Sequence, residues 1–331
     1  MNRGFISSLL LTALASSPVA GGELAAGQDL EATEAAAGDV NAAAAEYGRQ
    51  PDETPPEDSG DSILSGKSVL SDLLETGLDQ ASLFPQAGAA LHQRISDFRE
   101  QLDVFDLKVS TDYSALFQHA SSTLSGDNTA SSQVFRLLGT WLNIGDPDGH
   151  HGRLVWKGEY RGAFLGNPAP RDMGFDTGSA LSTANYKEMG WGLTDFYWHQ
   201  RFNGDKVAIK VGHMDPGDWA DQYPLLNAWT RFLNDAFYNN PTESIPKRGF
   251  GIVGHTYLRD RVYLMGGIHD ANGPDTRPDF DQLFDSREFM TWAEIGYRGE
   301  RNLAAGHNVH VHIWQQDARE EEGTERSKGI T

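Results

Sequence analysis

Apolar and polar residues alternate along most of the chain after Val104. The clearest run is 153–165, in which Leu154, Trp156 and Tyr160 share one face with two glycines. The other face carries charges. Successive side chains of a strand point to opposite sides, so this run predicts a strand with one apolar and one charged face. The basic residues of the charged face are Arg153, Lys157 and Arg161.

The same period of two recurs in several other segments. These are 105–117, 135–141, 188–202, 206–214, 250–268 (two strands around a short turn), 288–298 and 307–316. With a further strand that starts near Lys328, we expect about nine or ten strands. Short turns alternate with long polar loops such as 166–187 and 270–287.

Alternation alone leaves two architectures open. A soluble sandwich would bury the apolar faces, whereas a membrane barrel would expose them to lipid and turn the charged faces to a water-filled lumen. Aromatic residues near strand ends, and short turns that alternate with long loops, favour the barrel. The predicted fold class is therefore all-β, an antiparallel transmembrane β-barrel with a short helical N-terminal segment.

Composition divides the chain into four parts. Residues 1–22 have the basic start and short apolar core of a signal peptide. Residues 23–62 are acidic and poor in aromatics, which predicts a disordered periplasmic segment. Leucines at helical spacing predict a helical segment over 63–103, and the barrel is expected over 104–331.

Charge and cysteine content exclude some functions. The net charge of −20 disfavours nucleic acid as a partner. The chain has no cysteine, so it has neither disulfides nor thiolate metal sites.

A long loop between two strands, 215–248, is rich in aromatic and polar residues. Aromatic rings can stack on sugars, and polar groups can replace water around hydroxyls. The predicted substrate path contains, in this loop, Asp215, Asp218, Trp219, Trp229, Arg231, Asn234, Asn240 and Arg248, and on strand faces Arg153, Lys157, Arg161 and Lys210. Packing of the loop against the wall explains Trp219, Arg231 and Asn234 equally well. Pairing with acids is the commoner role for the strand charges.

Other candidate chemistry is weaker. His310 and His312 share a strand face, but the sequence offers no third metal ligand beside them. The segment 146–151 lacks the full ligand set of a calcium loop, so a turn is expected. No nucleophile elbow or phosphate loop is present. We therefore predict no catalytic residue, no metal and no cofactor, and expect that the chain is not an enzyme.

Several motifs resemble the carbohydrate-selective outer-membrane porins, the OprB-type family. They are Gly212-His213-Met214-Asp215-Pro216, Trp229-Thr230-Arg231-Phe232-Leu233-Asn234, Asn240-Pro241 and Gly249-Phe250-Gly251. The resemblance implies a sixteen-stranded barrel of the bacterial outer membrane through which glucose and other sugars diffuse passively. The strands present are fewer, so the chain resembles the N-terminal part of such a porin.

The expected partners follow from this resemblance. They are small sugars, outer-membrane lipid and, because porins are often trimeric, two further copies of the chain. Two other functions stay open at this point. One is a secreted soluble β-protein that binds or cleaves glycans, and the other is a porin for anions, favoured if the basic strand residues crowd one constriction.

Overall fold

The computed structural model describes most of the chain after residue 96. The described ranges are 97–98, 100–146, 149–178, 183–204, 206–221, 233–237, 240, 242–281, 286–298, 308–319 and 322–331. The predicted signal peptide, the acidic segment and most of the predicted helical segment lie outside them. All described residues belong to one compact unit. The four-part division of the chain stays a prediction.

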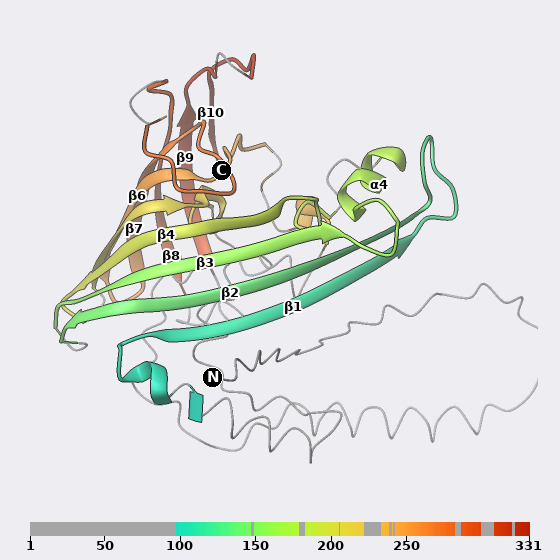
Figure 1. Ribbon diagram of the computed structural model, residues 1–331. Helices are drawn as coiled ribbons and strands as arrows, with labels where there is room; N and C mark the ends of the chain where they lie inside the picture. Colours follow the sequence, from blue (N-terminus) through green and yellow to red (C-terminus); the bar gives the residue numbers. More distant parts are fainter. Residues whose placement is uncertain are drawn as a thin grey trace, which may run out of the picture. The chain divides into compact units, whose positions relative to one another are not determined.

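Ten strands form one antiparallel sheet within the described residues, and each strand pairs with the next in chain order (Figure 1). They are β1 (Lys108–His119), β2 (Thr129–Gly145), β3 (His151–Ala163), β4 (Gly190–Phe202), β5 (Val207–Met214), β6 (Gly249–Arg259), β7 (Val262–Asp270), β8 (Phe289–Arg298), β9 (Asn308–Gln316) and β10 (Ser327–Ile330). The predicted all-β antiparallel class and strand number are confirmed.

The connections between strands differ at the two ends of the sheet. One end has short turns at 146–150, 203–206 and 260–261. In the first turn, the Asp146 amide donates to the His150 carbonyl at 2.9 Å, so this segment is the expected turn. The other end has the long loops 164–189 and 215–248. The first contains helix α4 (Pro170–Asp176), and the second contains the 3-10 turns η2 (Pro216–Asp218) and η3 (Asp235–Phe237).

No helix among the described residues combines the length and the apolar character needed to cross a bilayer.

Burial across the sheet is the reverse of that in a soluble protein. On β3 the charged residues Lys157, Glu159 and Arg161 are buried, whereas Trp156 and Tyr160 on the opposite face are partly exposed. The same holds further along the sheet, where apolar residues are the exposed ones: Ile209, Ile252, Leu264, Ile268, Ile295, Val311 and Ile313. The described strands form one sheet, and no second sheet packs on this apolar outer face.

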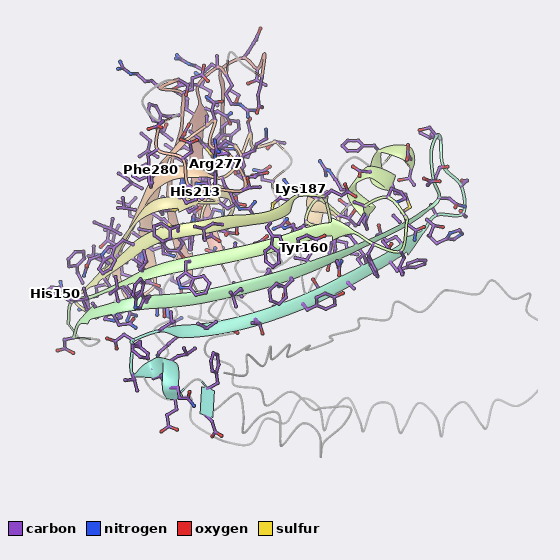
Figure 2. All side chains as sticks on the ribbon, viewed as in Figure 1. His150, Tyr160, Lys187, His213, Arg277 and Phe280 are labelled. Carbon is purple, nitrogen blue, oxygen red and sulfur yellow. The ribbon has the colours of Figure 1, made fainter. Side chains whose placement is uncertain are left out.

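Aromatic side chains, among them Tyr160 (labelled in Figure 2), lie near both ends of the strands on the outer face. Towards the long loops, the Trp191 ring packs 5.3 Å from that of Tyr160 and 5.9 Å from that of Phe135. Towards the short turns lie Trp141 and Tyr297, both nearly half exposed. Two aromatic zones that flank an apolar band are typical of strands that cross a membrane.

A β-bulge interrupts the pairing of β3 with β4. Lys157 pairs with Asp195 while the adjacent Gly158 pairs with Leu193, so Thr194 is the extra residue. Both Thr194 and Asp195 are buried. The bulge therefore shifts the alternation of β4 and places Asp195 on the charged face beside Lys157.

Candidate functional site

The candidate site is the charged inner face of the sheet together with the described parts of the loop 215–248, which are 215–221, 233–237, 240 and 242–248. Across the first three strands, Asp112, Arg136 and Glu159 are successive cross-strand neighbours. Arg136 Nε donates to Asp112 Oδ2 at 2.7 Å. Opposite charges on adjacent strands attract one another, so the three side chains of this row stabilise one another.

Two further cations are paired on β3. Arg161 Nε donates to Glu159 Oε2 at 2.7 Å, and Lys157 Nζ lies 3.3 Å from Glu159 Oε1. Lys157 also forms an ion pair with Asp195. All four side chains are buried. Buried charges persist only when paired, so these residues form a rigid ionic network.

The loop begins by covering Lys210 of β5. The Lys210 ammonium lies 3.2 Å from the centre of the Trp219 ring and 5.3 Å from that of Tyr197. The Trp219 and Tyr197 rings meet edge to face at 6.0 Å. A cation over an indole face is attracted by the ring quadrupole, more strongly when water is excluded. With only 2% of its surface exposed, Trp219 fixes the loop to the wall.

Arg248, just before β6, joins three loop segments. Its guanidinium lies 3.2 Å from Asp215 and 3.6 Å from Asp275, and Lys187 lies 2.6 Å from Asp275. Asp215 also caps η2, because its carboxylate accepts from the Gly217 amide at 3.0 Å. These contacts hold the start of the loop against its end.

Two carboxyl groups here have shifted pKa values. Burial, and then the negative charge of Asp215, raise the pKa of Asp218 to about 7. Burial also acts to raise the pKa of Asp275, but the hydrogen bond and charge of Lys187 and the charge of Arg248 outweigh it, so that pKa is lowered. Asp218 is therefore the group here that changes charge near neutral pH.

The remaining predicted path residues are spread over the inner face and the loop. Arg153 is half-buried and belongs to the same cross-strand row as His199 and Lys210. Asn240 donates to Asp221 at 3.0 Å and to Thr331 at 2.8 Å, next to the end of β10. Asn234 caps η3 by accepting from the Ala236 amide at 3.0 Å. Trp229 and Arg231 lie outside the described residues.

The structure thus gathers Lys157, Arg161, Lys210, Asp215, Asp218, Trp219 and Arg248 at the start of the loop, while Asn234 and Asn240 lie in its later part. Sequence reasoning did not single out Asp112, Arg136, Asp195 and Asp275. Arg136 lies at an alternate position between Phe135 and Leu137, so its place on the charged face was available from the period of two. Asp195 could not be placed on the charged face from the period of two, because the β-bulge shifts the alternation of β4.

One mixed cluster could hold a metal ion. Asp221, Glu294 and His310 bring their ligand atoms within 4.8 Å of one another. No third ligand for His310 could be predicted from the sequence, because Asp221 and Glu294 are distant in the chain and meet His310 only when the loop packs on β8 and β9.

A single sheet with an apolar outer face and a charged inner face, against which the start of a long loop packs, is typical of the wall of an outer-membrane β-barrel. A family model described as "Carbohydrate-selective porin, OprB family" matches residues 165–326. This match confirms the family resemblance and, with it, the expected class and location.

Among solved structures, the high-pH structure of Pseudomonas putida OprB is similar. It is 11% identical, with a TM-score of 0.47, and the match covers 70% of this chain and 58% of that one. The chain thus spans less than two thirds of that relative's length. No curated protein matches the chain.

Proposed function

We propose that the chain forms the wall and constriction of a pore through which sugars such as glucose diffuse passively across the outer membrane. The observation that carries this proposal is the reversed burial of the sheet. Charged side chains such as Lys157 and Glu159 are buried, whereas the apolar side chains of Ile209 and Ile252 are exposed. Lipid on the outer face and water on the inner face would make this arrangement stable.

The polar groups of the site suit an uncharged solute. Arg153, Asp215 and Asp218 are half-buried, so they would offer hydrogen bonds to hydroxyls along the path. Several shallow contacts of this kind bind weakly enough to release the solute, which conduction requires. Buried residues such as Lys157, Arg161, Lys210 and Trp219 would act by holding the loop and wall in place.

The pairing of cations supports a sugar pore over an anion pore. Lys157 and Arg161 are matched by Glu159 and Asp195, and Arg248 is matched by Asp215 and Asp275. The constriction therefore concentrates no excess of positive charge at these residues. A trimeric assembly and an annulus of outer-membrane lipid are part of the proposal.

The alternative, a soluble glycan-binding β-protein, is not favoured. In such a protein, the exposed outer face with Leu264, Ile268 and Val311 would be in water. Contiguous apolar surface of this kind marks a contact with lipid or with another molecule.

Liposome swelling tests the proposal. Vesicles that contain the folded full chain should swell in iso-osmotic glucose faster than empty vesicles, and more slowly in larger oligosaccharides. A charged sugar acid of similar size serves as the control for selectivity. Swelling no faster than that of empty vesicles, from protein that is folded and inserted, would refute the proposed function.

A further inference from the structure

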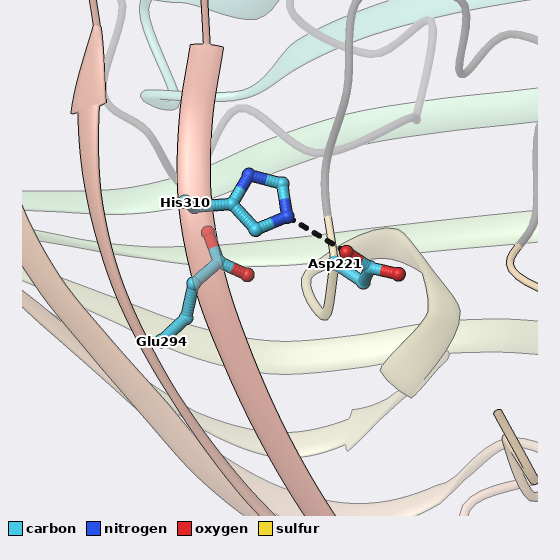
Figure 3. Close-up of side chains that lie close together, drawn as sticks. All are labelled: Asp221, Glu294 and His310. Atoms are coloured by element: carbon cyan, nitrogen blue, oxygen red, sulfur yellow. Dashed lines mark hydrogen bonds and ion pairs between the residues drawn. The ribbon is translucent and has the colours of Figure 1, made fainter. Parts of the chain in front are cut away.

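The loop also meets the far part of the sheet, at β8 and β9, through a cluster of acids and histidines. His310 Nε2 lies 2.7 Å from Asp221 Oδ1 (Figure 3). The Glu294 carboxylate from β8 lies beside the His310 ring, within the 4.8 Å that spans the three ligand atoms. Asp221 and Glu294 are buried, with 5% and 1% of their surface exposed.

The hydrogen-bonding capacity of the Glu294 carboxylate is only partly used in this arrangement. Its Oε1 accepts from the Tyr263 hydroxyl at 2.5 Å, whereas its buried Oε2 has no hydrogen bond of good geometry. The nearest charge partner for Oε2 is His312 Nδ1 at 3.3 Å. A carboxylate oxygen can accept from more than one partner, so Oε2, which has one ion pair with His312, can also coordinate a cation.

We propose that Asp221, Glu294 and His310 bind a divalent transition-metal ion, with Zn²⁺ as the best match. One imidazole nitrogen and two carboxylates form a mixed donor set that this ion accepts in tetrahedral geometry, with a fourth position open to water. The ion would take the place of the hydrogen bond between His310 and Asp221, and its binding would release the proton held there.

Neighbouring side chains form an outer layer that fits this site. His312 Nε2 lies 3.0 Å from Glu243 Oε1, and its Nδ1 faces Glu294. Residues that contact metal ligands orient them and tune their affinity. Because Asp221 lies on the loop whereas Glu294 and His310 lie on β8 and β9, the ion would fasten the loop to these two strands, two residues after its Trp219 contact with β5. This role is separate from sugar passage.

Metal titration tests the proposal directly. The purified full chain in detergent, treated with chelator and dialysed, is titrated with Zn²⁺ by calorimetry, and with Co²⁺ while visible absorption is recorded. We expect one ion per chain and absorption bands of a four-coordinate Co²⁺ centre. His310→Asn and Glu294→Gln should each weaken binding at least tenfold, because each removes a ligand or its charge.

His199→Asn is the matched control, because His199 is also a buried inward-facing histidine but lies on β4. It should bind Zn²⁺ like the unmodified chain. Heat-modifiable migration in gels identifies folded variants, and Asp221→Asn replaces either variant that fails to fold. No Zn²⁺ binding by the unmodified chain, or undiminished binding by the folded ligand variants, would overturn the proposal and leave a hydrogen-bonded cluster of acids and histidines.

Discussion

At the scale of single residues, the inner face combines buried charge pairs with a cluster of buried apolar and aromatic side chains such as Leu138, Val155 and Trp292. Lys157, Glu159 and Arg161 are almost fully buried, yet each has a partner of opposite sign within ion-pair distance. Removing one member of such a pair leaves an uncompensated buried charge, which is far more costly than losing an exposed pair. Each of these buried charges is therefore stabilised by a neighbouring side chain of opposite charge.

Asp218 is the residue through which pH should act on the pore. Its pKa of about 7 means that it is neutral below pH 7 and negative above it. We expect the cation preference of the channel, measured as a reversal potential in a KCl gradient, to rise through pH 7. Asp218→Asn should stay at the low-pH value. Asp146→Asn, in an exposed turn on the other end of the sheet, should behave like the unmodified chain.

The same pKa has a consequence for stability. Because the pKa of Asp218 in the folded protein lies above its ordinary value of 3.8, folding favours the protonated form. The contribution of Asp218 is therefore greatest below pH 4 and is lost as pH rises through about 7. Asp218→Asn should remove this part of the pH dependence of stability.

A reversal potential that is as pH-dependent in Asp218→Asn as in the unmodified chain would contradict the assignment of the pH effect to Asp218.

Sequence reasoning identified the residues of the inner face better than their contacts. The period of two placed Lys157, Arg161 and Lys210 on the charged face, and the structure agrees. It could not supply their partners, since Asp195 reaches Lys157 through a bulge and Asp275 reaches Arg248 from a different loop. Contacts between distant segments depend on register and loop path, which local patterns do not encode.

At the scale of elements, strands β5 to β9 expose apolar residues on their outer side. Ile252 in β6 and Leu258 near its end are 43% and 54% exposed. In a membrane, Arg at Ile252 should destabilise the protein by roughly 2–4 kcal/mol, whereas Arg at Leu258, near the interface, should cost about 0–1 kcal/mol. Urea unfolding in lipid vesicles measures both. Equal and small effects would indicate that water, not lipid, covers this face.

Arg248 anchors the long loop through its ion pairs with Asp215 and Asp275. Arg248→Met should destabilise the anchored loop by roughly 3–5 kcal/mol, since Asp215 and Asp275 would lose a buried partner. The neighbouring Lys247 has an exposed pair with Glu322, so Lys247→Met should cost at most about 1 kcal/mol.

Protease sensitivity of the loop and fluctuations of single-channel current report this difference. Loop cleavage and current noise should increase in Arg248→Met and stay unchanged in Lys247→Met. Equal behaviour of the two variants would show that Arg248 does not anchor the loop.

The strands were largely predictable from the sequence, but their limits and the loops were not. The run expected from residue 105 begins as a strand only at Lys108, because the chain turns at 104–106 and Asp106 adopts a φ of 53°. The expected loop 166–187 contains helix α4, which starts at Pro170. Proline at the first turn fixes a helical φ, but seven residues are too few for a clear helical period.

At the scale of the whole molecule, the long loop is anchored at several points on the charged face of the sheet. The loop is held near β5 by Trp219 and Lys210, near β6 by Arg248, and beside β9 by Asp221. Anchors on several strands would keep a constriction in place while solutes pass. The path residues and the sugar specificity stay predictions that the swelling assay and the variants above test.

The central claim is that lipid contacts the apolar face of the sheet. The chain has no cysteine, so single cysteines can be introduced along β6 from Phe250 to Thr256 and spin-labelled in vesicles. Collision with oxygen, which dissolves in lipid, should be high at positions 250, 252, 254 and 256 and low at 251, 253 and 255. High accessibility of the even positions to a water-soluble nickel complex instead, or no alternation, would contradict the account.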